Sequence, residues 1–74
     1  MTIHITSTTK IVHLNGVPAR IWEGMTESGI RVHCFVTRIA VGKDENVEQF
    51  EAELSKQRIP SPEVASAYPD RMIL

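Results

Sequence analysis

The fold is decided by residues 9–41, which run TKIVHLNGVPARIWEGMTESGIRVHCFVTRIAV. Asn15-Gly16 lies between two apolar runs and is typical of a two-residue hairpin turn, because both central positions of a type I′ turn need a positive φ. Residues 26–29, Thr-Glu-Ser-Gly, have the composition of a second turn. We therefore predict three antiparallel strands over residues 9–14, 17–25 and 30–41.

The lengths of the two turns predict how the strands pair. A two-residue turn pairs Leu14 with Val17, and a four-residue turn pairs Met25 with Ile30. Since side chains alternate between the two faces of a sheet, one face then becomes continuously apolar apart from Glu23. Its apolar members are Val12, Leu14, Val17, Ala19, Ile21, Met25, Ile30, Val32, Cys34 and Val36.

The opposite face of the predicted sheet is mixed aromatic and basic. In the predicted register Trp22 lies opposite His33, and Arg20 lies opposite Phe35. This face carries Ile11, His13, Pro18, Arg20, Trp22, Gly24, Arg31, His33 and Phe35.

The third predicted strand is not expected to stay regular to its end. After Val36 the apolar positions fall out of alternation. In the predicted register Pro18 also opposes Thr37, and proline cannot donate to a ladder of hydrogen bonds. A bulge or bend near Thr37 would explain both features, after which the last part of the third strand is expected to turn away and pair elsewhere.

Downstream of the strands the sequence predicts one main helix. Residues 44–57 place Val47, Phe50 and Leu54 at helical spacing, with Asp44 as the N-cap. We expect this apolar stripe to cover the apolar face of the sheet, as is usual for an amphipathic helix.

The last part of the chain is predicted to be a tail. Two prolines end the main helix, and Ser61-Pro62 resembles the N-cap and first residue of a short helical turn through residues 63–67. Residues 72–74 are apolar, and they are expected to pair with a sheet edge of the same molecule or of a second copy.

The predicted fold class is thus α+β. It is a three-stranded antiparallel β-meander with one α-helix packed on one face, plus a C-terminal tail with a short helical turn. Residues 1–8 are an N-terminal strand or tail, residues 9–58 the βββα domain and residues 59–74 the tail. A chain of 74 residues with 42% apolar residues fits one small folded domain, whose limited core is often supplemented by self-association.

Charge is distributed unevenly along the chain. Residues 1–43 carry five Lys and Arg against two Glu, whereas residues 44–58 carry two against five acidic residues. The predicted sheet is therefore basic and the predicted helix acidic. The single cysteine excludes an internal disulfide and fits a reducing cytoplasm. There is no apolar run long enough to cross a membrane, and residues 1–4 lack the basic start of a signal peptide.

The sequence contains no recognisable catalytic or metal-binding motif. Cys34 falls on the predicted apolar face while His33 points to the other face, so they cannot form a nucleophile–base pair. We interpret Cys34 as a small buried hydrophobic residue. His13 and His33 lack paired cysteines and nearby carboxylates. The chain is therefore predicted to be a non-enzyme without cofactor or metal.

The cluster of Arg20, Trp22, Arg31, His33 and Phe35 admits three interpretations. It is an ordinary solvated sheet face, a surface for protein binding or self-association, or a nucleic-acid surface. For the last, the outline is similar to the sheet-reading DNA-binding domains of integrases and plant AP2 factors, but the overall positive charge that supplies non-specific affinity is missing.

Protein interaction is the leading prediction, with a homodimer expected and DNA binding as the alternative. Trp22, Phe35 and Arg20 would anchor the contact, and Arg31 and His33 would lie at its rim. No membrane partner is expected.

Three segments resemble short uncharacterised proteins of proteobacteria and their prophages. They are GVPARIWEGMTESG (residues 16–29), TRIAV (residues 37–41) and QFEAEL (residues 49–54). The resemblance implies a cytoplasmic accessory protein of bacterial or phage origin, such as an inhibitor or adaptor that binds a host protein. It implies no activity and no site residues.

Overall fold

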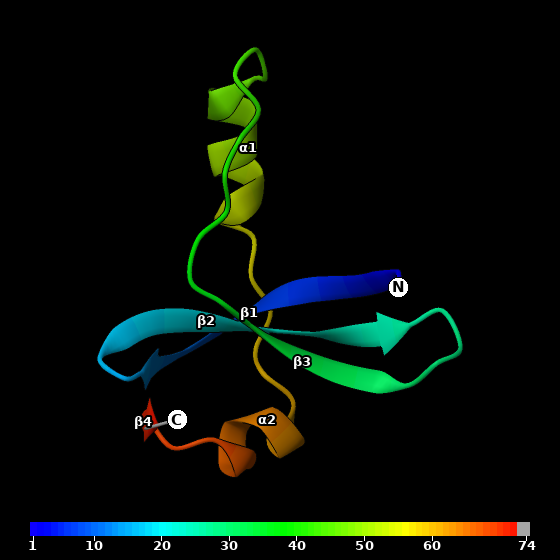
Figure 1. Cartoon of the computed structure of the whole chain (residues 1–74), viewed down its shortest axis with the longest axis vertical. Helices are drawn as coiled ribbons and strands as arrows, with labels where there is room; N and C mark the ends of the chain where they lie inside the picture. Colours follow the sequence, from blue (N-terminus) through cyan, green and yellow to red (C-terminus); the bar gives the residue numbers. More distant parts are fainter. Residues whose placement is uncertain (73–74) are drawn as a thin grey trace.

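The computed structural model describes residues 1–72, and in that part of the chain it shows an α+β fold with four strands in one mixed sheet and two short helices (Figure 1). The strands are β1 (Ile3–Leu14), β2 (Val17–Thr26), β3 (Arg31–Val36) and β4 (Arg71–Met72), arranged in the order β3-β2-β1-β4. The first three pair antiparallel and β4 pairs parallel to β1. The helices are α1 (Val47–Leu54) and α2 (Pro62–Ala67).

The first hairpin has the predicted turn and register. Asn15 and Gly16 have φ values of 51° and 84°, as a type I′ turn requires. Leu14 pairs with Val17, so the predicted pairing is confirmed. The strand also extends further back than predicted, because β1 begins at Ile3 and pairs with β2 up to Thr26.

A bulge interrupts β1 in its middle, between Ser7 and Ile11. Thr8 stabilises it, since its Oγ1 donates a hydrogen bond of 2.7 Å to the carbonyl of Ile21 and its carbonyl accepts one of 2.9 Å from Arg20 Nη1. Thr8 is fully buried. The bulge therefore replaces lost ladder bonds with side-chain bonds, as buried polar groups require.

The register predicted for the second hairpin is wrong by one residue. Met25 pairs with Arg31 instead of Ile30, because Ile30 belongs to the turn, where its carbonyl accepts a hydrogen bond of 2.9 Å from the amide of Thr26. Gly29 provides the positive φ, 88°. Since the side-chain period of a strand is two, this single extra turn residue moves every side chain of β3 to the opposite face.

The inner face of the sheet, which we define by Val12, Ala19 and Ile21, forms the core with α2. These three side chains and Val64 of α2 are the fully buried apolar residues among residues 1–72, and Leu14, Phe35, Tyr68 and Met72 pack around them. Ser61 is the N-cap of α2 and Pro62 its first residue, as predicted. α2 therefore provides the cover that the sequence assigned to the main helix.

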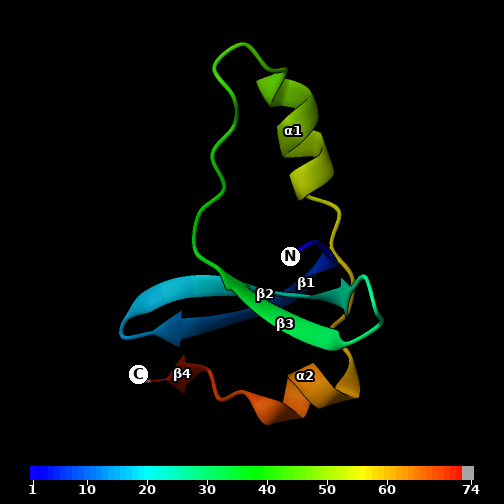
Figure 2. The same ribbon diagram turned by 45° about the vertical axis from the view of Figure 1, so that its right-hand side comes forward.

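α1 is shorter than predicted and does not cover the sheet. It begins after Asn46, whose Oδ1 accepts a hydrogen bond of 3.0 Å from the amide of Gln49, so Asn46 and not Asp44 is the N-cap. None of the residues of α1, all within the described part of the chain, is buried. The helix stands away from the sheet (Figures 1 and 2).

β3 ends at Val36, so the segment before α1 leaves the sheet near Thr37. A bend was predicted at this position. It then runs alongside α1 in both views (Figures 1 and 2). We call residues 37–57, which go out along this segment and return through α1, the arm.

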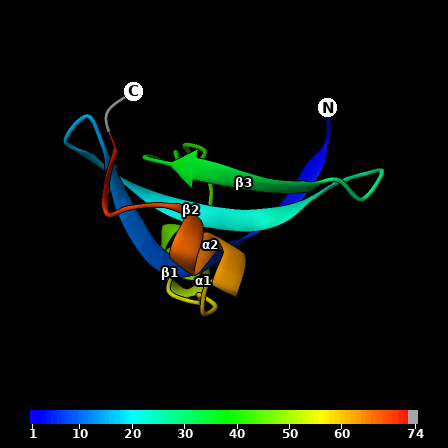
Figure 3. The same cartoon turned by 90° about the horizontal axis from the view of Figure 1, so that it is seen from below.

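The two helices lie on opposite sides of the sheet, and the chain between them crosses the edge of β1. At the bulge, the amide of Thr9 donates to the carbonyl of Arg58 at 2.9 Å, and the amide of Arg58 donates to the carbonyl of Ser7 at 3.0 Å. Figure 3 looks onto the face that α2 covers, with α1 behind the sheet. These two hydrogen bonds hold the connection between the helices at the edge of β1.

The C-terminal tail pairs within the same molecule. Arg71 and Met72 form β4 beside His13 and Leu14 of β1. Ile73 and Leu74, the other residues of the predicted docking tail, lie outside the described residues. Within residues 1–72, neither helix has the length and apolar character needed to span a bilayer.

Candidate functional site

The five residues predicted to form one binding cluster are divided between the two faces of the sheet. Phe35 pairs with Ile21 of the inner face, and His33 pairs with Glu23, also on that face. Trp22 instead pairs with Cys34. Arg31, His33 and Phe35 therefore lie on the inner face and Arg20 and Trp22 on the outer face, so the predicted pairs Trp22–His33 and Arg20–Phe35 are wrong.

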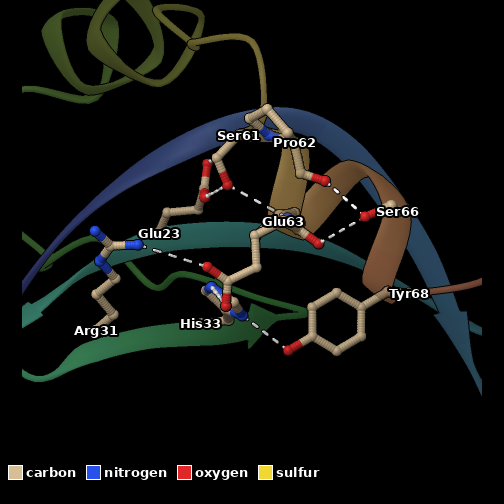
Figure 4. A network of polar contacts seen from close by, with 9 residues as sticks. Glu23, Arg31, His33, Ser61, Pro62, Glu63, Ser66 and Tyr68 are labelled. Atoms are coloured by element: carbon tan, nitrogen blue, oxygen red, sulfur yellow. Dashed lines mark hydrogen bonds and ion pairs between the residues drawn. The ribbon is translucent and has the colours of Figure 1, made fainter.

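The inner-face residues hold α2 on the sheet (Figure 4). The ring of Phe35 meets that of Tyr68 edge to face, with centroids 5.0 Å apart, and His33 Nδ1 lies 2.8 Å from Tyr68 Oη. Glu63 in the first turn of α2 lies 3.8 Å from Arg31 Nη1 and 3.9 Å from His33 Nε2. These side chains are engaged with their own chain, so we assign them a structural role.

Glu23 is the polar exception in the predicted apolar face, and the structure explains its place there. Its carboxylate accepts hydrogen bonds from both Oγ and the amide of Ser61, the N-cap of α2 (Figure 4). Burial raises the pKa of Glu23, but the two bonds from Ser61, together with the nearby charges of Arg58 and His33, outweigh it, so its pKa lies below the ordinary value. Glu23 therefore fastens the start of α2 as a carboxylate.

The outer face carries Trp22 at its centre. Trp22 is half-buried and opposes Cys34 on β3, while Ser7 of β1 opposes it on the other side. Cys34, predicted on the apolar face as a buried residue, is therefore half-buried on the outer face. With Val32 and Val36 of β3 also moved there by the register, the outer face is more apolar than predicted.

An open groove lies between the outer face and the base of the arm. Its volume is ≈ 270 Å³, and Trp22 and Leu54 line both this groove and a neighbouring depression that reaches Phe50. Arg20 and Arg38 contribute the basic side chains of the groove, while its apolar lining comes mainly from Ile11, Pro18, Trp22, Val36, Ile39 and Leu54.

The arm presents apolar side chains to solvent. Val47 is 50% exposed, Ile39 44% and Leu54 37%. The five acidic residues of the predicted helix are exposed on the same arm; they are Asp44, Glu45, Glu48, Glu51 and Glu53. The groove and the arm together, which we call the arm groove, form the candidate functional site.

Most of this site could not be found from the sequence. Trp22 and Arg20 were predicted correctly to share a face, since they are two residues apart on one strand. The arm residues Val47, Phe50 and Leu54 were found as a stripe but assigned to the core. Glu23 is the signal that could have corrected the assignment of this stripe to the core. A carboxylate in an otherwise apolar face indicates that a polar partner, such as the Ser61 N-cap, packs there instead of an apolar stripe.

The described residues offer little for metal or covalent chemistry. No group of three or more potential metal ligands occurs among residues 1–72, and His13 and His33 lie on opposite faces of the sheet. Cys34 and His33, being neighbours on a strand, also point to opposite faces.

Comparisons with known proteins add no further assignment. No family model matches the chain, and no match was found among curated proteins or among solved structures. The function is therefore argued from the geometry of the arm groove.

Proposed function

We propose that this chain is a small non-enzymatic protein-interaction module that binds its partner through the arm groove. The observation that carries the proposal is α1, a helix with an apolar stripe that stands off the sheet beside an apolar groove lined by Trp22. An amphipathic helix normally buries its stripe, and here the chain's own sheet does not bury it.

The length of α1 supports this proposal. The helix has eight residues, and an isolated helix shorter than about 12–15 residues is marginal in water. Its stability must therefore come from packing. A partner that packs against Val47 and Phe50 would provide it, and binding would then be coupled to stabilisation of the arm.

The composition of the arm groove also suits protein binding. Tryptophan and arginine are the residues most enriched among those that dominate interface energies, and Trp22, Arg20 and Arg38 occur together here. The apolar centre with charged residues around it matches the usual anatomy of such interfaces.

DNA binding was the alternative function predicted from the sequence. It depended on Arg20, Trp22, Arg31, His33 and Phe35 lying on one face of the sheet, and they do not. Arg31 and His33 lie on the inner face with Glu63. Fewer basic groups than predicted therefore face outward from one surface. Binding to random duplex DNA that weakens steeply with salt would favour this alternative over the proposal.

A cellular role follows as part of the same proposal. The size of the chain, its single cysteine and its resemblance to short prophage proteins support a cytoplasmic accessory protein or inhibitor that acts by binding another protein.

Co-purification from cells tests the proposed function. A tagged chain is expressed in bacterial cells together with an untagged copy and recovered under mild conditions. We expect a stoichiometric protein partner, whether the untagged copy or a different chain, to be lost with Trp22→Ala, because Trp22 lines both the groove and the depression beside it. The matched control is Met25→Ala, an exposed position on the inner-face side of the same strand. Retention of the partner by Trp22→Ala, with the variant folded, would contradict the proposal.

A further inference from the structure

The single chain exposes more surface than its mass requires. A folded monomer of 8.3 kDa is expected to expose about 4,600 Å², whereas this chain exposes 5732 Å². The surplus of about 1,100 Å² is close to the roughly 800 Å² that each partner buries in a standard interface. The radius of gyration, 13.4 Å, likewise exceeds the value of about 11 Å expected for this length.

The arm contributes exposed apolar residues to this surface. The arm extends away from the sheet in both side views (Figures 1 and 2), and its apolar residues Ile39, Val47 and Leu54 are exposed. A partner that covers the arm groove would therefore remove the apolar surface that the monomer leaves in water, which is the main favourable term in association.

Charge indicates what kind of partner fits. The segment of residues 44–58, which includes α1, carries five acidic residues against two basic ones, whereas residues 1–43 carry five basic against two acidic. The groove beside the arm contributes Arg20 and Arg38. An acidic helix with an apolar stripe is thus complementary to an apolar groove with basic residues, and both halves belong to this one chain.

We propose that the groove lined by Trp22 and Arg38 is occupied by α1 of a second copy of this chain, in a two-fold dimer in which each α1 packs its apolar stripe into the groove of the other copy. A two-fold interface needs a surface that is complementary to itself, and the arm groove has this property. The inference rests on the proposed function and specifies its partner. A different protein carrying an acidic amphipathic helix is the alternative outcome.

Charge reversal with mixing tests this arrangement. One variant, Glu51→Arg, changes α1, and the other, Arg38→Glu, changes the groove at the base of the arm; both side chains are exposed. We expect wild-type protein to have the mass of a dimer by light scattering at micromolar concentration. Each variant alone should raise the dimer dissociation constant by about tenfold or more, because the unfavourable like-charge contact occurs twice in a symmetric dimer.

The mixture distinguishes exchange between copies from other causes. In a dimer of the two variants, the reversed arm meets the reversed groove, and the unchanged arm meets the unchanged groove. We therefore expect an equimolar mixture to recover the dimer mass, with the mixed species identified by native mass spectrometry. The matched control is Glu27→Arg, at an exposed acidic position in the turn between β2 and β3. This variant should have the same dimer mass in solution as the wild type. Circular dichroism of each variant checks that it remains folded.

Three results would overturn the inference. If the wild type is a monomer at every concentration, a second copy does not occupy the groove. The proposed function would still hold in that case if the co-purification recovers a different protein that is lost with Trp22→Ala. A dimer that neither variant weakens would place self-association elsewhere on the molecule. If each variant weakens the dimer but the equimolar mixture of the two does not recover the dimer mass, α1 of one copy does not contact the groove of the other.

Discussion

At the scale of single residues, Glu23 shows how a carboxylate can belong to the core side of a small sheet. The helix α2 has Ser61 as its N-cap, and its first turn has backbone amides without a partner inside the helix and a partial positive charge. Glu23 accepts from the amide and the hydroxyl of Ser61, while that hydroxyl accepts from the amide of Val64 at 3.3 Å. The strand and the helix are thereby joined through one capping residue.

Glu23→Gln should remove part of the pH dependence of the free energy of unfolding in the acid range. The folded pKa of Glu23 lies below its ordinary value of 4.5, so its contribution is fully present above that value and is lost as the pH falls through the lower folded pKa. We expect the urea midpoint of the wild type to fall between about pH 5 and pH 3 more steeply than that of the variant. Glu27→Gln, in the exposed turn, is the control and should keep the wild-type slope. Equal slopes for Glu23→Gln and wild type would contradict this account.

Gly24 is a second residue whose identity is set by its surroundings. A Cβ at this position would overlap the backbone carbonyl of His4 in β1. Gly24→Ala should therefore destabilise the fold by about 3 kcal/mol, the upper part of the range for overpacking, as measured by urea unfolding. Gly42→Ala in the arm would meet only the flexible side chain of Glu45 and should change stability little. A neutral Gly24→Ala would mean that the two strands separate there at no cost.

At the scale of elements, the two helices have opposite roles. α2 is short but inserts Val64 into the core, whereas α1 is longer and buries none of the residues described for it. Helix length is thus a poor guide to which helix stabilises the domain. What matters is the apolar area that the helix removes from water.

The same substitution in each helix should separate these roles. Val64→Ala deletes a fully buried side chain and should cost about 2 kcal/mol through lost burial and the cavity that remains. Val47→Ala acts on a side chain that is 50% exposed and should change the stability of the monomer by no more than about 0.5 kcal/mol. Urea unfolding at a concentration where the mass is that of a monomer provides the comparison. Equal losses would show that α1 packs on its own sheet.

At the scale of the whole molecule, the arm makes the chain extended, with dimensions of 37 × 33 × 23 Å. A chain of this length has a small core, and self-association is a common way to supplement it. The arm groove would let two small cores share one larger apolar interface.

Tryptophan fluorescence should report on the occupation of the groove. Trp22 is the single tryptophan; it is half-buried and lines the groove. We expect its emission to shift to longer wavelength on dilution, because separation of the copies exposes the indole to water. Leu54→Ser, which removes an apolar lining residue, should show the long-wavelength emission at all concentrations. Emission of the wild type that is independent of concentration, while the mass changes from dimer to monomer, would place the interface away from Trp22.

The sequence by itself determined the elements whose signals are local. Asn15-Gly16 specifies the turn and register of β1 with β2, because few residue pairs accept two positive φ values in succession. Ser61-Pro62 specifies the start of α2 by capping and by a preset φ. The apolar positions of β1 and β2 followed from these signals, and so did the common face of Arg20 and Trp22.

Only the tertiary structure decided which face of β3 joins the core and which helix covers it. One extra residue in the turn at Ile30 exchanges the two faces of β3, and the local composition of that turn does not discriminate between the two lengths. The choice between α1 and α2 depends on where the connection crosses the sheet. Its backbone pairs with Ser7 and Thr9 at the bulge of β1, a contact between segments about 50 residues apart that no local pattern encodes. For this reason the stripe of α1 was visible in the sequence, while its position outside the core was not.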